Sequence, residues 1–239
     1  MEDFPGELRN TDPKKLYKKD GDIVFSFFLN LAFVYNDLQR QKKIVRLFQS
    51  TYRKPKPIET TAHSGSYCGM NVHLNKYFVG ILHEFFEFLK HTDSTNSKLF
   101  STKLFSDVIQ SVSHKTRSDW DELLKIAKGQ DKSHLNLTLE AVRNKVSFHY
   151  NRKERKLENS FKNAFLNKTR NLGEKTKYAY FSTIDKKVDT IFYSDAAIEE
   201  YMREEISDKG FHTLIDETIA KTIDALRDIL TTYLEQVQK

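Results

Sequence analysis

The chain has few of the residues that build disulfide frameworks, tight turns or metal clusters. Its 239 residues include one cysteine, four prolines and eight glycines. The single thiol, Cys68, excludes an intramolecular disulfide and a cysteine-based zinc cluster, and it fits a reducing compartment. Because glycine and proline are scarce, the composition favours long helices over a turn-rich β fold.

A long hydrophobic run is also missing. The most apolar stretch, residues 23–35, is interrupted by Asn30, and a membrane-spanning helix needs about twenty apolar residues. The first residues carry neither the basic nor the apolar segment of a secretory signal. We therefore expect a cytoplasmic protein that does not cross a membrane, in which residues 23–35 form part of a buried helix.

The apolar content that is present suffices for one large core. Hydrophobic residues make up 38% of the chain and include eighteen Phe and eleven Tyr. We expect a single all-α domain over residues 1–239. Residues 20–150 would form the bundle core with a motif helix, and residues 151–239 a basic helix, a small hairpin and the C-terminal helices.

Hydrophobic periodicity places these elements along the chain. A loop is expected at 51–65, a polar break at 91–98, and a β-hairpin at 178–193, where β-branched and aromatic residues flank a turn. Ser118 is expected to cap a helix at its N-terminus. Apolar residues at helical spacing predict helices over 20–49, from the first loop to about 91, and over 99–112, 118–128, 133–150, 154–169, 195–207 and 211–237.

Positive charge is concentrated in one segment. Residues 143–177 hold eleven Lys or Arg against three Glu, a net charge of +8, which leaves −2 for the rest of a chain whose total is +6. A local basic region favours a polyanionic partner, nucleic acid first and an anionic membrane surface second. A solvated helix face is the alternative explanation.

The stretch from Arg143 to Tyr150 holds the side chains that are best suited to catalysis in this sequence. Arginine offers a permanently charged planar group that suits a phosphate. Histidine, here His149, both accepts and donates a proton near pH 7. Together they suffice to cleave RNA without a metal: His149 would take the proton of a ribose 2′-hydroxyl, and Arg143 would stabilise charge on the phosphorane-like transition state. Asn144 would orient the phosphate or the histidine.

Helical geometry complicates a site made by one copy of this stretch. Six residues at about 100° each leave Arg143 and His149 about 120° apart around a helix. Either the helix ends or bends near Ser147, or two copies of the chain meet and each phosphate contacts both. His149 also continues the apolar seam of Leu135 and the residues that follow it, so a buried structural histidine is the alternative.

The order Arg143-Asn144, four residues, His149 near the end of a helix resembles the signature of the HEPN superfamily. That resemblance implies a dimeric helical bundle with two Arg/His sets at the shared interface. It further implies a metal-independent endoribonuclease that leaves a 2′,3′-cyclic phosphate, found among toxins of toxin–antitoxin, abortive-infection and other antiphage systems. Arg143 and His149 would then be catalytic and Asn144 the supporting polar residue.

Partners follow from the same interpretation. We expect RNA as substrate, a homodimer, and an antitoxin or other defence-system protein as a possible regulator, with no cofactor and no metal. The cations expected to contact the RNA backbone, which makes binding sensitive to salt, are Lys145, Arg152, Lys153, Arg155 and Lys156.

Other functions remain open on the sequence alone. A catalytically silent helical module that binds RNA or a protein is the main alternative, and a protein that binds a membrane surface through the basic segment is a further one. His83-Glu84 lacks the second histidine of a zinc-protease helix, so His73 and His83 are expected in the core or at its rim.

Overall fold

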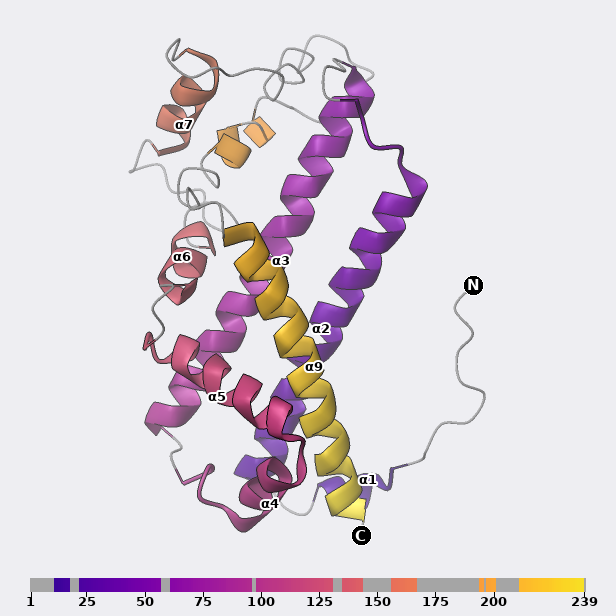
Figure 1. Cartoon of the computed structure of the whole chain (residues 1–239), viewed down its shortest axis with the longest axis vertical. Helices are drawn as coiled ribbons and strands as arrows, with labels where there is room; N and C mark the ends of the chain where they lie inside the picture. Colours follow the sequence, from indigo (N-terminus) through magenta and orange to yellow (C-terminus); the bar gives the residue numbers. More distant parts are fainter. Residues whose placement is uncertain are drawn as a thin grey trace.

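A computed structural model describes residues 11–17, 22–56, 61–95, 98–130, 135–143, 156–166, 194–195, 197–200 and 211–238 (Figure 1). Every regular element within these ranges is a helix and none is a strand, which confirms the all-α class. The predicted hairpin at 178–193 lies outside the described residues. No helix in the described part combines the length and the hydropathy that crossing a membrane requires.

Eight helices have defined bounds, and residues 194–195 and 197–200 are helical as well. The predicted helices 20–49, 154–169 and 211–237 are confirmed, with ends that shift by a few residues. The bounds are α1 Pro13–Leu16, α2 Ile23–Thr51, α3 Ala62–Thr95, α4 Lys103–Ser111, α5 His114–Ala127, α6 Leu135–Val142, α7 Lys156–Phe165 and α9 Phe211–Gln238.

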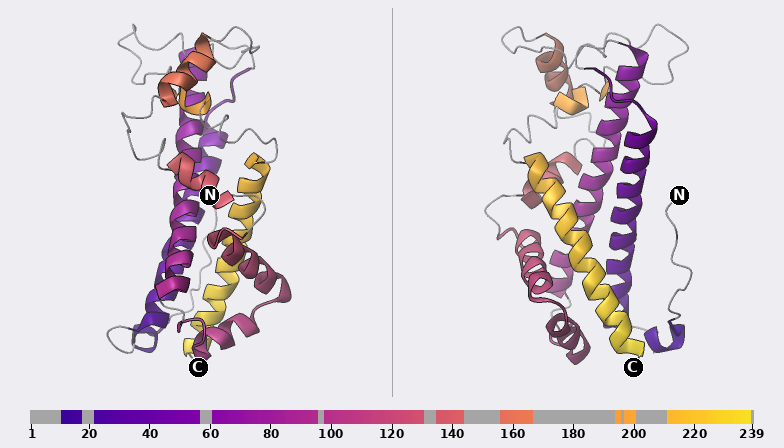
Figure 2. Two further views of the ribbon diagram at one scale, coloured as in Figure 1. Left: turned by 90° about the vertical axis from the view of Figure 1, so that its left-hand side faces the viewer. Right: turned by 45° about the vertical axis from the view of Figure 1, so that its right-hand side comes forward.

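Four of these helices form a ring around the core. Helix α2 contacts α3 and α9, and α5 contacts the same two helices from the other side. Helix α4 packs on α9, and α6 packs on α3 and α5. Figures 1 and 2 show α2 and α3 side by side along the long axis, with α9 crossing them obliquely. Helices α2 and α6 consequently lie on different sides of α3.

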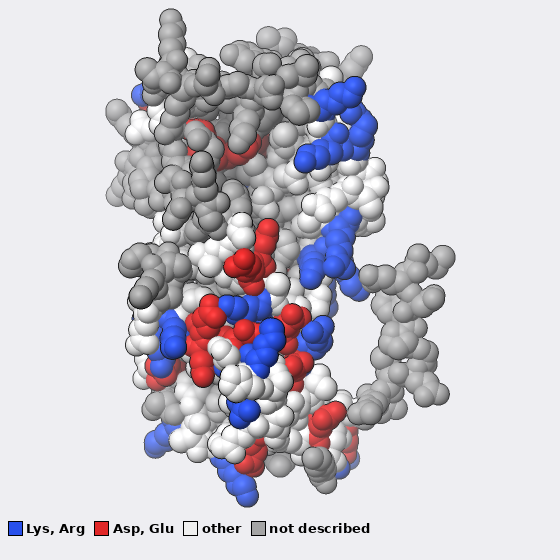
Figure 3. Space-filling model, viewed as in Figure 1, with Lys and Arg blue, Asp and Glu red and all other residues white. Residues whose placement is uncertain are grey.

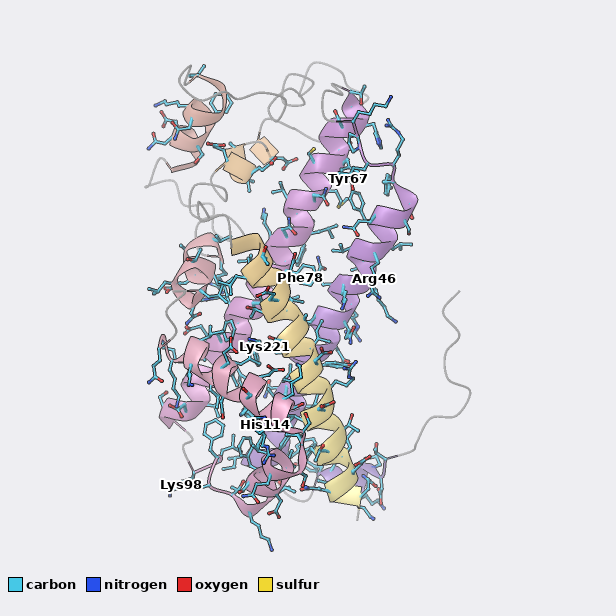
Figure 4. All side chains as sticks on the ribbon, viewed as in Figure 1. Arg46, Tyr67, Phe78, Lys98, His114 and Lys221 are labelled. Carbon is cyan, nitrogen blue, oxygen red and sulfur yellow. The ribbon has the colours of Figure 1, made fainter. Side chains whose placement is uncertain are left out.

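Aromatic rings fill the centre of the ring of helices. Phe27 of α2 lies in edge or stacked contact with Phe28, Phe88, Phe100, Phe105 and Trp120. The only tryptophan of the chain is thus a packing residue. A smaller cluster of Phe48, Tyr67 and Leu74 joins the far ends of α2 and α3 (Figure 4).

Two predicted boundaries are wrong, one because of a capping side chain and the other because of packing on the core. The cap of helix α5 lies five residues before Ser118: the Ser113 hydroxyl accepts a hydrogen bond from the Thr116 amide at 3.1 Å, which satisfies one of the free amides of the first turn. Helix α3 continues through the first half of the expected polar break and ends at Thr95. Its last turns remain helical because they pack on the core through Thr92, which is buried.

Candidate functional site

Helix α6 brings the first residue of the motif to the surface of α3. Leu135, Leu139 and Val142 are fully buried and step by four and then three residues, so they form one face of the helix against α3 and α5. This part of the predicted apolar seam is confirmed. Arg143 follows directly after the last turn of α6. Because Val142 is buried, it fixes the point at which the side chain of Arg143 leaves the core.

The Arg143 guanidinium is held by a carboxylate from α3. Its Nη2 donates a hydrogen bond to Oε1 of Glu84 at 2.8 Å, and the side chains are 29% and 62% exposed. An ion pair at such an exposed position contributes little to folding, about 0–1 kcal/mol. Its main effect is geometric, because it fixes one edge of the guanidinium against α3.

A buried histidine adjoins this pair. His83 is 6% exposed, and its Nδ1 has no hydrogen-bond partner within the described residues. Burial lowers the pKa of His83, the positive charge of Arg143 lowers it further, and Glu84, Glu87 and Glu140 oppose that effect. The imidazole is therefore neutral at pH 7, and the core position expected for His83 is confirmed.

The junction of α3 and α6 contains two buried polar side chains. Besides His83, Asn136 of α6 is buried, and its Oδ1 also lacks a hydrogen-bond partner in the described part of the chain. Buried polar atoms nearly always have partners, so these two atoms mark the junction as polar; the contacting helices α5 and α9 hold a second such pair, Arg117 Nε and Thr222 Oγ1. Arg143 lies at the outer edge of the junction between α3 and α6.

Most of the predicted site residues fall outside the described residues. Asn144, Lys145, His149, Arg152, Lys153 and Arg155 all lie there, and Lys156 is the first residue of α7. Of the Arg143–His149 motif, the described residues thus include Arg143 alone. No group of three or more His, Cys, Asp or Glu within the described ranges is arranged to hold a metal ion.

Two features of the surface were missed by the sequence reasoning. Glu84 lies 59 positions from Arg143 in the chain, so no local pattern indicates their ion pair. The second is a basic region on α2 and the loop after it: residues 38–56 contain seven Lys or Arg and no acid. Figure 3 shows blue side chains along that edge of the molecule. Counting charge in short windows along the whole chain would have found it.

No protein-family model matches the chain, and no curated protein or solved structure does either.

Proposed function

We propose that the protein is a metal-independent endoribonuclease of HEPN type that acts as a dimer, as a toxin or an antiphage effector. The observation that carries the proposal is the position of Arg143. The first residue of the Arg143-Asn144-x4-His149 motif follows a helix that buries one face in the core, and its guanidinium is fixed by Glu84. The motif supplies the charge and the proton acceptor that RNA cleavage needs.

The proposed reaction uses the ribose as its own nucleophile. His149 takes the proton of the 2′-hydroxyl, the 2′-oxygen attacks the adjacent phosphorus, and the bond from phosphorus to the 5′-oxygen breaks. The 5′-oxygen leaves with the proton that His149 took up, and a 2′,3′-cyclic phosphate remains. Arg143 stabilises the additional negative charge on the phosphoryl oxygens. Since only RNA carries the attacking hydroxyl, the reaction selects RNA over DNA.

The position of Glu84 fits a supporting role in this reaction. A guanidinium has five N–H donors in a planar fork, and the bond to Glu84 uses the Nη2 side of it. A phosphate oxygen that binds here contacts a guanidinium whose orientation is already fixed. Because that orientation is fixed beforehand, the entropic cost of forming the site is lower. Asn144 completes the proposed set as the polar residue beside the arginine.

The proposal is tested by cleavage of RNA in the presence of EDTA. The wild-type chain should cut a single-stranded RNA and leave a 2′,3′-cyclic end. His149→Ala and Arg143→Ala should each reduce the rate by at least about a hundredfold, the usual effect of removing a charge stabiliser or a general base. Arg143→Lys should remain impaired, because an ammonium keeps the charge without the planar fork.

Lys90→Ala provides the matched control for Arg143→Ala. Lys90 is an exposed cation on α3, paired with Glu87 at 3.4 Å, and its loss should leave the rate unchanged. RNA binding without cleavage would instead identify a silent RNA-binding module. Cleavage that survives both His149→Ala and Arg143→Ala would show that another site, or a contaminant, does the chemistry.

A further inference from the structure

Helix α2 carries an apolar face that is exposed among the residues the structure describes. The described part of the chain exposes eleven large hydrophobic side chains, and five of them belong to α2. Four of these five, Leu29, Phe33, Ile44 and Leu47, fall within about 60° of one another at 100° per residue. They are 43%, 59%, 50% and 67% exposed, on the side of the helix opposite the buried Leu31 and Leu38.

We infer that this face, Leu29, Phe33, Ile44 and Leu47 with Asp37 and Arg40 between them, is the site at which a second copy of the chain docks through its own α2, antiparallel. In a two-fold interface, each residue i that contacts residue j is matched by j contacting i. Residues paired across an antiparallel helix dimer therefore have position numbers with a constant sum.

The spacing of the face follows that rule to within one residue. Leu29 with Leu47 sums to 76, and Phe33 with Ile44 sums to 77. The two charged residues at the centre, Asp37 and Arg40, also sum to 77. Two pairs of apolar side chains would thus form on each side of the two-fold axis. The contact would be about 27 Å long from Leu29 to Leu47 at 1.5 Å per residue. At the axis itself, Asp37 and Arg40 of each copy would form two reciprocal ion pairs.

Charge selects the antiparallel orientation over the parallel one. Residues 22–37 contain two Asp and no cation, whereas residues 38–56 contain seven Lys or Arg and no acid. Antiparallel docking brings each basic half against the acidic half of the other copy, and parallel docking would bring the two basic halves together. Within one chain, Arg40 and Asp37 are 3.8 Å apart and well exposed, so little is lost when each changes partner.

A groove next to the face provides room for the second copy. A cavity of about 360 Å³ between α1, α2 and α9 is lined almost entirely by apolar side chains, among them Phe25, Leu29 and Leu230. In the antiparallel arrangement Leu47 of the second copy lies against Leu29, at the rim of this groove. Four apolar side chains per copy are fewer than a standard interface contributes, so a weak, concentration-dependent association is expected.

This interface is separate from the proposed catalytic site and does not rest on it. Helix α6 contacts α3 and α5, and α2 contacts α3 and α9, so docking through α2 leaves α6, the helix that precedes Arg143, on another side of α3 (Figure 1). If chains also meet through the motif, the two interfaces together produce assemblies larger than a dimer. Disrupting the α2 face halves the mass where α2 docking joins two equal units, and it reduces any larger assembly to the unit held by the other interface.

The test is the mass of the full-length chain measured by light scattering from about 1 to 100 µM, a range that covers weak association. The wild type should associate, and Phe33→Asp should halve its mass at the upper concentration. Asp37→Arg places two arginines opposite each other and Arg40→Asp two aspartates, so each variant alone should also halve the mass. An equimolar mixture of the two should regain the wild-type mass, because each Arg then meets an Asp.

Only a second copy predicts recovery on mixing. Glu158→Lys, which reverses a charge in an exposed ion pair on α7, serves as the control and should leave the mass unchanged. A wild type that is monomeric at 100 µM, or single variants that lose mass without recovery on mixing, would overturn the inference. The inference would also be overturned if the variants kept the wild-type mass but lost binding to RNA or to anionic vesicles, because the face would then bind a polyanion. Loss of RNA cleavage bears on the proposed function alone.

Discussion

His83 is a buried residue whose protonation opposes folding. Its pKa is lowered in the folded chain by burial and by Arg143, so below the ordinary value of 6.5 the unfolded chain takes up a proton that the folded chain does not. The unfolding free energy should therefore fall as the pH drops from 7.5 towards 5.5, with a slope of up to about 1.4 kcal/mol per pH unit from this residue.

Denaturant unfolding of His83→Gln at several pH values measures the contribution of His83. The variant should show a shallower loss of stability between pH 7 and 5.5 than the wild type. His114→Gln changes an exposed histidine and should keep the wild-type slope. Parallel profiles for wild type and His83→Gln would mean that the imidazole titrates alike in both states.

Gly69, the eighth residue of α3, is a residue whose replacement tests a specific close contact. A Cβ at this position would collide with the Asp195 carboxylate, 3.1 Å from its Cγ. Gly→Ala inside a helix ordinarily stabilises by about 1 kcal/mol, but here the collision should reverse that gain. In an Asp195→Ala background the same change should stabilise by the ordinary amount. A double-mutant cycle of unfolding free energies measures the coupling, and equal effects in both backgrounds would contradict the contact.

At the scale of helices, the start of α5 gives the sharpest test, because two serines compete as its cap. Ser113 accepts from the Thr116 amide, and the Thr116 hydroxyl donates to Asp228 of α9 at 2.7 Å, which ties the cap to the neighbouring helix. Ser113→Ala should lower the unfolding free energy by about 1 kcal/mol. Ser118→Ala, at an exposed position inside the same helix, should be neutral or slightly stabilising. A larger loss at Ser118 would restore the boundary predicted from sequence.

The same helix shows what sequence alone can and cannot predict. Long helices such as α2 and α9 are recovered from periodicity because each presents a continuous apolar face to the core. The start of α5 is not, since Ser113 and Ser118 both suit a cap locally, and what distinguishes them is the contact of Thr116 with α9, 112 residues away. For the candidate site, the local motif predicts Arg143, whereas its partner Glu84 is determined by the packing of α6 on α3.

At the scale of the whole molecule, charge is divided between two basic regions. One is the segment 143–177, with a net charge of +8, and the other is residues 38–56, with seven cations and no acid. The rest of the chain offsets them with a net charge of −9, and Figure 3 shows red and blue side chains mixed on one face. The proposals assign the two regions different partners: RNA phosphates for the first and a second copy of α2 for residues 38–56.

The salt dependence of RNA binding separates these two assignments. Binding to single-stranded RNA weakens with salt with a logarithmic slope of about −0.7 per phosphate contact. Replacing all five of the proposed backbone-contact cations, Lys145, Arg152, Lys153, Arg155 and Lys156, with Gln should weaken binding and flatten the slope by up to about 3.5. Replacing Arg53 and Lys54 with Gln should change neither the affinity nor the slope, since both residues belong to the other basic region.

Fluorescence anisotropy with the His149→Ala variant, which should not cut the probe, measures the affinity and the slope from about 50 to 300 mM salt. An unchanged slope in the five-fold variant, or a flattened one in the Arg53 and Lys54 variant, would exchange the roles of the two regions and make residues 38–56 the RNA-binding surface.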